Sequence, residues 1–256
     1  MIEEEEKLMD YYNRKEVVDS YEQVRFNTPF KKANHEVEIS IINAYLKEYS
    51  NIKLLEIGVG TGRVTRNLIF TGKGIGVDSS ENMLNNIRKK IYNKKWSFIK
   101  QNIFNLNFPK SSFDVVITLR VIRHFDNGSI RKALKQIHNV LKKGGLLIFD
   151  MPNSDYNCRY LNKLLETKKK NKNEIYESKI PINLLVNELT ALGFNIIDIK
   201  PIKFEYLRLV SYLAEILKIK WFMNVVFNYI YKKEVSCYNN KKCSDILIIS
   251  KKSFFG

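Results

Sequence analysis

The sequence predicts an α/β fold with a mostly parallel sheet, and three observations indicate it. A short apolar strand over 53–57 runs directly into a glycine-rich turn and then into a helical pattern. A second apolar strand, 74–77, follows this segment. A third, 114–118, is apolar at almost every position, as in a strand that is buried on both faces. Strands that alternate with helical segments are typical of α/β proteins.

The composition fits one globular domain. The chain has 256 residues, of which 45% are hydrophobic and 27% charged, so it can bury a sizeable core. Cys158, Cys237 and Cys243 are odd in number and form no C-x-x-C pair. This pattern suggests neither a disulfide framework nor a zinc site, and we expect no metal. The acidic start of the chain lacks the apolar core of a signal peptide, and a reducing cytoplasm fits both observations.

The net charge of +16 implies attraction to polyanions such as RNA or anionic lipid. The densest basic run, Lys168–Lys172, contains no aromatic platform of the kind that binds single-stranded RNA. A solvated, lysine-rich surface is the alternative interpretation. RNA therefore remains a candidate partner only on the ground of charge.

The first 49 residues are expected to form a helical cap ahead of the sheet. The segment that begins at Asn34 has apolar residues at helical spacing. The segment before it is less regular, and Pro29 breaks its pattern.

The glycine-rich turn carries the first functional prediction. Gly58, Gly60 and Gly62 follow the first strand, and such a turn lets a backbone approach a nucleotide cofactor closely. Arg63 stands where the dinucleotide fingerprint has its third glycine, which argues against a nicotinamide or flavin cofactor. Asp78 ends the second strand, at the distance where a carboxylate meets ribose hydroxyls.

Five stretches in order resemble the motifs of class I S-adenosylmethionine-dependent methyltransferases: EIGVGTGR, GIGVDSSENML, FIKQNIFNLNF, SSFDVVITLRVIRHF and ALKQIHNVLKKGGLLIFDMPN. The resemblance covers roughly residues 15–200 and the last strand, and is strongest to the group of ubiquinone and menaquinone synthesis. It implies a Rossmann-like sheet of seven strands in the order 3-2-1-4-5-7-6, with the last strand antiparallel and helices on both faces.

The remaining elements follow in order. Ser79 and Ser80 can cap a helix over 81–90, and the third strand spans 96–100. A helix over 128–142 leads through a KKGG turn into the fifth strand, LLIFD. A helix after Pro181 ends at Gly193, a strand FNIIDIK follows, and the final strand lies within 244–252. With the cap over 1–49, the cofactor-binding core is expected to span 50–200.

The resemblance also implies roles around the methionine part of the cofactor. Glu56 is an acid in an apolar strand, costly to bury without a donor, and would face the methionine amino group. Arg63 would reach the carboxylate or be solvated. From the cap, Tyr21 and Arg25 would fold over the cofactor, the arginine toward the carboxylate. Their alternative is a half-buried tyrosine and a surface arginine.

Around the adenosine part, the implied contacts come from later motifs. Met83 would pack on the adenine ring, unless it is simply core. Asn102 replaces the usual aspartate, but its amide can accept from and donate to adenine. Ile103 would lie beside the ring, Ser79 next to the ribose acid, and the backbone of Leu119 near the methionine part.

His124 is the candidate general base, because it follows the fourth strand where an acceptor would approach. The alternative is an interface histidine bonded to the next loop. His35 and His138 are expected to be exposed. The chain has neither an N/D-P-P-Y motif nor a Pro-Cys after the fourth strand, which argues against methylation of RNA bases.

Residues 201–243 are predicted to be a helical insertion before the last strand. They are apolar and aromatic, but Arg208, Glu215, Lys218 and Lys220 interrupt them, which excludes a membrane-spanning helix. Three interpretations stay open: a lid over the substrate, a surface-lying membrane contact through 204–233, or a dimer face.

Together these patterns predict a methyltransferase that uses S-adenosylmethionine on a small, apolar or lipid-like acceptor, by O- or C-methylation. The alternatives are an RNA methyltransferase, favoured by charge, and a non-catalytic cofactor-binding or interaction protein. A nicotinamide-dependent reductase is a remote third. The sequence leaves the oligomeric state open.

Overall fold

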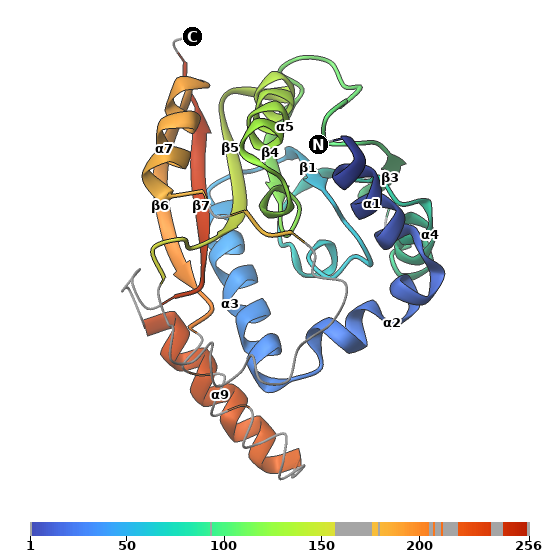
Figure 1. Ribbon diagram of the computed structural model, residues 1–256, viewed down its shortest axis with the longest axis vertical. Coiled ribbons are helices and arrows are strands. Elements are labelled where there is room, and N and C mark those ends of the chain that lie inside the picture. Colours follow the sequence, from blue (N-terminus) through green and yellow to red (C-terminus); the bar gives the residue numbers. More distant parts are fainter. Residues whose placement is uncertain are drawn as a thin grey trace.

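The computed structural model describes residues 2–92, 94–156, 176–178, 180–204, 207, 211, 220–236 and 243–254. Cys158, Cys237, the basic run Lys168–Lys172 and much of 201–219 lie outside these residues. Seven strands form one sheet in the order β3-β2-β1-β4-β5-β7-β6, as predicted (Figure 1). The strands are β1 Ile52–Ile57, β2 Gly72–Asp78, β3 Trp96–Lys100, β4 Phe113–Thr118, β5 Leu141–Pro152, β6 Phe194–Ile202 and β7 Asp245–Lys252. Only β7 runs antiparallel to its neighbours.

Helices pack on both faces and at one edge of this sheet (Figure 1). They are α1 Ile2–Asn13, α2 Lys15–Phe26, α3 Pro29–Leu46, α4 Glu81–Lys90, α5 Asn127–Val140, α7 Ile182–Ala191 and α9 Lys220–Ser236. Two 3-10 turns, η1 Thr65–Asn67 and η2 Ile122–His124, follow β1 and β4. α1 and α2 both contact α4, whereas α3 contacts α9.

The core lies on both faces of the sheet. Along β1, Leu55 belongs to the cluster under α5, and Leu54 belongs to the cluster under α3. Along β4, Val116 and Ile117 divide in the same way. Successive side chains of a strand point to opposite faces, so a continuous apolar run fills two layers at once.

Pro29 interrupts the helical pattern before it, as predicted, since α2 ends at Phe26, and Pro29 also begins the next helix. It occupies the first turn of α3, where a backbone N–H has no partner within the helix, so the lack of one in proline costs no hydrogen bond. The Thr28 hydroxyl caps the same end by accepting from the Lys31 amide at 3.3 Å.

Two local predictions were wrong. The helix expected after the glycine turn is only η1, because Asn43 of α3 holds the backbone that follows. Its side chain donates to the Asn67 carbonyl and accepts from the Ile69 amide, both at 2.9 Å. The KKGG turn lies within β5, where Gly144 has φ +71° and the pairing with β4 shifts register.

A buried ion-pair cluster joins the carboxyl end of β4 to β5 and β7. Arg123 is 4% exposed and binds Asp150 at 2.9 Å and Asp245 at 3.2 Å. Lys203 adds a second cation to Asp245 at 3.2 Å. These cations hold the pKa of Asp245 well below its usual range, although burial alone would raise it.

We expect Arg123→Met to lower the free energy of unfolding by about 3–5 kcal/mol, since it leaves buried Asp150 without its ion-pair partner and Asp245 with Lys203 alone. Urea unfolding measures this. The matched control is Arg131→Met, which removes an exposed pair with Glu188 and should cost less than about 1 kcal/mol. Equal losses in both variants would contradict the prediction.

Candidate functional site

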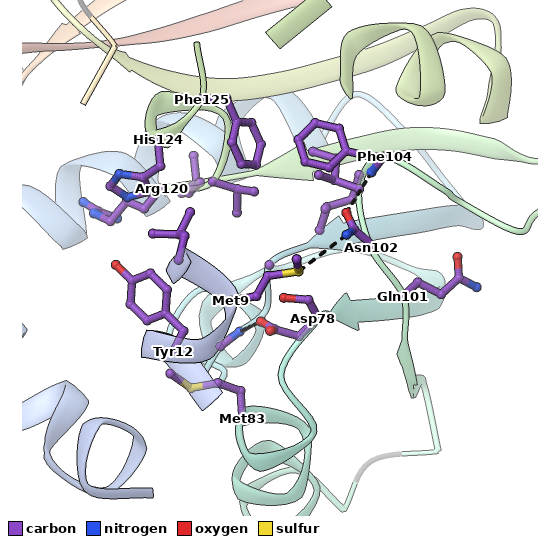
Figure 2. A pocket seen from close by; sticks show the side chains of 18 of the residues that line it. Met9, Tyr12, Asp78, Met83, Gln101, Asn102, Phe104, Arg120, His124 and Phe125 are labelled. Atoms are coloured by element: carbon purple, nitrogen blue, oxygen red, sulfur yellow. Dashed lines mark hydrogen bonds between the residues drawn. The ribbon is translucent and has the colours of Figure 1, made fainter. Parts of the chain in front are cut away.

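A cavity opens at the carboxyl ends of β1, β2 and β4 and beside the turn after β3 (Figure 2). Ligands of open α/β sheets bind at this edge. Ten predicted site residues line it: Tyr21, Gly58, Gly60, Asp78, Ser79, Met83, Asn102, Ile103, Leu119 and His124. Four others, Arg25, Glu56, Gly62 and Arg63, do not belong to its lining.

The glycine turn is fixed to β2 and leaves space above it. Gly58 has φ +75°, and a Cβ there would lie 2.2 Å from a methyl group of Val121. At Gly60 a Cβ would meet nothing within 4 Å, so the backbone there faces open space. Gly62 instead allows close packing on Ile87 of α4, which explains why it lies away from the cavity.

Asp78 is held rigidly at the end of β2. One carboxylate oxygen accepts from the Gly60 amide at 2.8 Å, and the other accepts from the Ser80 amide at 2.9 Å. Burial raises the pKa of Asp78, and these backbone bonds oppose the rise. Each oxygen keeps a further lone pair for a ligand hydroxyl.

Glu56 is a buried acid below this turn. It is 2% exposed, and among the described residues its Oε2 has no hydrogen-bond partner. Burial raises its pKa to about 8, Thr65 and Arg63 lower it, and Asp78 raises it further. Two neighbouring acids of this kind favour a ligand that carries positive charge.

Asn102 lies beside α1 in the cavity wall (Figure 2). Its amide nitrogen donates to the Met9 sulfur at 3.5 Å, and its oxygen accepts from the Phe104 amide at 3.0 Å. The oxygen thus fixes the local turn, which leaves the amide nitrogen as the group nearest to α1.

The first helix supplies a wall that the sequence did not indicate. Leu8, Met9 and Tyr12 of α1 line the cavity. Leu8 and Tyr12 are one helical turn apart, and this spacing is the only signal that could have found them. Arg25 lies behind this wall, where it donates to the Tyr12 hydroxyl at 3.4 Å and lies over the Tyr21 ring.

Arg63 is buried, contrary to the predicted alternative that it is solvated, and it does not line this cavity. It stacks on Phe26 at 4.2 Å and pairs with buried Glu38 at 3.5 Å. Arg120, which does line the cavity, pairs with the same carboxylate. Burial, followed by the charge of Arg120, lowers the pKa of Arg63 to about 10.

His124 faces the cavity from η2. Its Nδ1 lies 2.9 Å from the Tyr176 carbonyl oxygen, so Nδ1 carries the proton and Nε2 keeps its lone pair. Burial lowers the pKa of His124, which keeps the ring neutral.

The other two histidines differ from the prediction that they are exposed. His35 is half-buried against Arg63, and burial lowers its pKa to about 3. His138 packs its ring edge-on against Phe194, with centroids 5.3 Å apart. The remaining described cysteine, Cys243, is buried, which raises its pKa to about 11. Within the described ranges, no group of His, Cys, Asp and Glu side chains could hold a metal ion.

The strand order, the glycine turn after β1 and the acid that ends β2 together define a class I methyltransferase fold. Residues 54–145 match a family described as a methyltransferase domain. The matched segment contains the glycine turn and the acid that ends β2, and the fold is that of class I S-adenosylmethionine-dependent methyltransferases.

Relatives of known sequence are similar over part of the chain. An uncharacterized methyltransferase of Oceanobacillus iheyensis is 33% identical over 105 residues, which cover 40% of this chain and 47% of that protein. A demethylmenaquinone methyltransferase of Lactococcus lactis is 29% identical over 151 residues, covering 56% and 58% respectively. The chain thus spans about half the length of these curated relatives.

A solved structure covers nearly the whole chain. The magnesium protoporphyrin IX methyltransferase of Synechocystis, determined with bound S-adenosylhomocysteine, aligns with a TM-score of 0.64. The alignment covers 97% of this chain and 100% of that one, at 13% sequence identity. At this identity the similarity shows the shared fold.

We expect Glu56 to make stability depend on pH. Its folded-state pKa of about 8 exceeds the ordinary 4.5, so the folded protein retains a proton that the unfolded chain loses. The contribution of Glu56 to stability should therefore fall between pH 4.5 and 8, by roughly 1 kcal/mol per pH unit, and level off above pH 8, whereas His35, whose pKa is lowered to about 3, contributes a rise up to about pH 6.5. Urea unfolding across this range measures the slope, which Glu56→Gln should reduce. An unchanged slope would contradict the prediction.

Proposed function

We propose that this protein transfers the methyl group of S-adenosylmethionine to a small apolar acceptor. The observation that carries the proposal is the rigid Gly60–Asp78 pair, which faces a cavity that is otherwise mostly apolar. Leu8, Phe104 and Phe125 contribute to the apolar part. The similarity to a demethylmenaquinone methyltransferase supports an acceptor of this kind.

The residues fit the cofactor group by group. Asp78 has lone pairs for the ribose hydroxyls, and the open backbone at Gly60 gives them room. Met83 and Ile103 offer apolar contact for an adenine ring, and the Asn102 amide offers a donor. Glu56 does not line the cavity, so its Oε2, which has no described partner, would meet the ammonium group only indirectly.

Transfer needs an electrophilic methyl group, which the sulfonium of the cofactor supplies, and the chain contributes orientation. Holding two reactants in line is worth effective molarities of roughly 10⁵ to 10⁸ M. α1 and the apolar side chains exclude water, which favours loss of positive charge during transfer. The Nε2 of His124 can accept a proton from an acceptor hydroxyl.

The test is transfer of a radiolabelled methyl group into fractionated cell extract, sorted into lipid, small-molecule and RNA pools. We expect label in the lipid or small-molecule pool. Label in RNA alone would support the alternative that the charge of +16 favours, an RNA methyltransferase acting in the cytoplasm. Binding of the cofactor with no label in any pool would support a non-catalytic cofactor-binding protein.

We expect Asp78→Ala to weaken S-adenosylmethionine binding at least about tenfold, since it removes two hydrogen-bond acceptors and frees the Gly60 amide. Isothermal calorimetry measures this. The control is Asp114→Asn, at the opposite end of β4, where the carboxylate pairs with Lys142. Equal affinity in the wild type and Asp78→Ala would contradict the assigned role.

We expect His124→Gln to lower kcat by about 10²-fold or more while cofactor affinity stays unchanged, since a general base acts only in transfer. The acid limb of the wild-type rate profile should lie below pH 6.5, because burial lowers the pKa of this histidine. A variant with full kcat would show that His124 only supports the loop at Tyr176.

A further inference from the structure

α9 presents an exposed apolar stripe on its outer face. Trp221, Val225 and Tyr229 are 72%, 43% and 47% exposed and follow one another at intervals of four residues. In a helix this spacing places all three side chains in one row. Large side chains in such a contiguous row mark an interaction surface, whereas single exposed apolar residues are ordinary.

The opposite face of α9 packs against the rest of the domain. Val226 and Ile230 are buried in the core, and the helix packs along α3 (Figure 1). Phe227 and Tyr231 stack between these two faces, with ring planes 11° apart. The helix is thus apolar on two faces, and among the described residues only the inner face packs against the rest of the domain.

Positive charge accompanies the stripe. Lys232 and Lys233 are exposed one turn beyond Tyr229, and the Lys233 ammonium lies 5.9 Å from the centre of that ring. The whole chain carries a net charge of +16. Tryptophan and tyrosine favour the boundary between lipid and water, and lysines beside them favour anionic headgroups.

We infer that α9 lies flat on an anionic lipid surface, with the Trp221–Val225–Tyr229 stripe inserted at the headgroup boundary. No helix in the described part of the chain is long and apolar enough to cross a membrane. A second copy of this chain is a poorer occupant, because pairing two stripes would bring together two proteins of charge +16.

A second cavity opens on a different side of α9 from the stripe. Met223 and Phe227 of α9 line a cavity with Phe26, and Arg63 and His35 form part of its inner wall. Arg63 shares Glu38 with Arg120 of the first cavity. The idea that the lipid surface supplies a lipid-like acceptor rests on the proposed function. The inference that α9 binds lipid does not.

The test is co-sedimentation of the purified full chain with vesicles of phosphatidylcholine, with and without 30% phosphatidylglycerol. We expect binding to the anionic vesicles only, weakened by salt. Trp221→Ala with Tyr229→Ala should reduce it at least about tenfold. The matched control is Tyr92→Ala, which removes an aromatic side chain that is 86% exposed between α4 and β3.

Tryptophan fluorescence gives a second readout that does not depend on methyl transfer. The chain has two tryptophans, and the other, Trp96, is packed between Phe70 and Phe98 in and beside β3. Anionic vesicles should shift the emission to the blue in the wild type and leave it unchanged in Trp221→Phe.

Three results would overturn the inference. One is the absence of vesicle binding, and another is full binding by the double alanine variant. The third is a wild-type dimer in analytical ultracentrifugation that Trp221→Ala converts to a monomer. If vesicles bind as expected but no cofactor binds, the proposed function fails and the lipid surface stands.

Discussion

The site depends on one hydrogen bond, from the Gly60 amide to Asp78. It joins the turn after β1 to the end of β2, and the parallel register of these two strands brings the groups together. Gly60 has φ +51°, a conformation that other residues adopt at a cost, and a Cβ there would enter the open space. The absence of a side chain at Gly60 therefore both permits this backbone conformation and leaves space for a ligand.

Around this bond, negative and positive charges are separated. Asp78 lines the first cavity and Glu56 lies below its glycine turn, and burial raises the pKa of each carboxyl group. Arg63 and Arg120 converge on Glu38, with Phe26 against both guanidinium groups. Glu38 thus compensates the charge of two arginines within the protein itself.

The sequence predicted the parts of this structure that depend on neighbouring residues. Strand β3 and strand β7 have the bounds expected from their apolar runs, and Ser80 caps α4 as its position suggested. The strand order followed from the family resemblance and is confirmed.

The failures arose where distant segments meet. The helix expected after Gly62 is replaced by η1, because Asn43 takes over its backbone partners. The place of Arg63 depends on Glu38 and Phe26, which come from α3 and α2. No local pattern contains such pairings, so a sequence reading cannot supply them.

Asn13 joins α1 to the start of α4 by hydrogen bonds. Its side chain accepts from the Ser80 hydroxyl at 3.0 Å, and its carbonyl accepts from the Asn82 amide group at 2.5 Å. Two such bonds are worth only about 1 kcal/mol each. A cofactor that touches Leu8, Met9 or Tyr12 would therefore add to the contacts that hold α1 on α4. By thermodynamic linkage, a change that stabilises the docked α1 in the free protein raises the affinity for such a cofactor. Protection of α1 from proteolysis then reports cofactor binding.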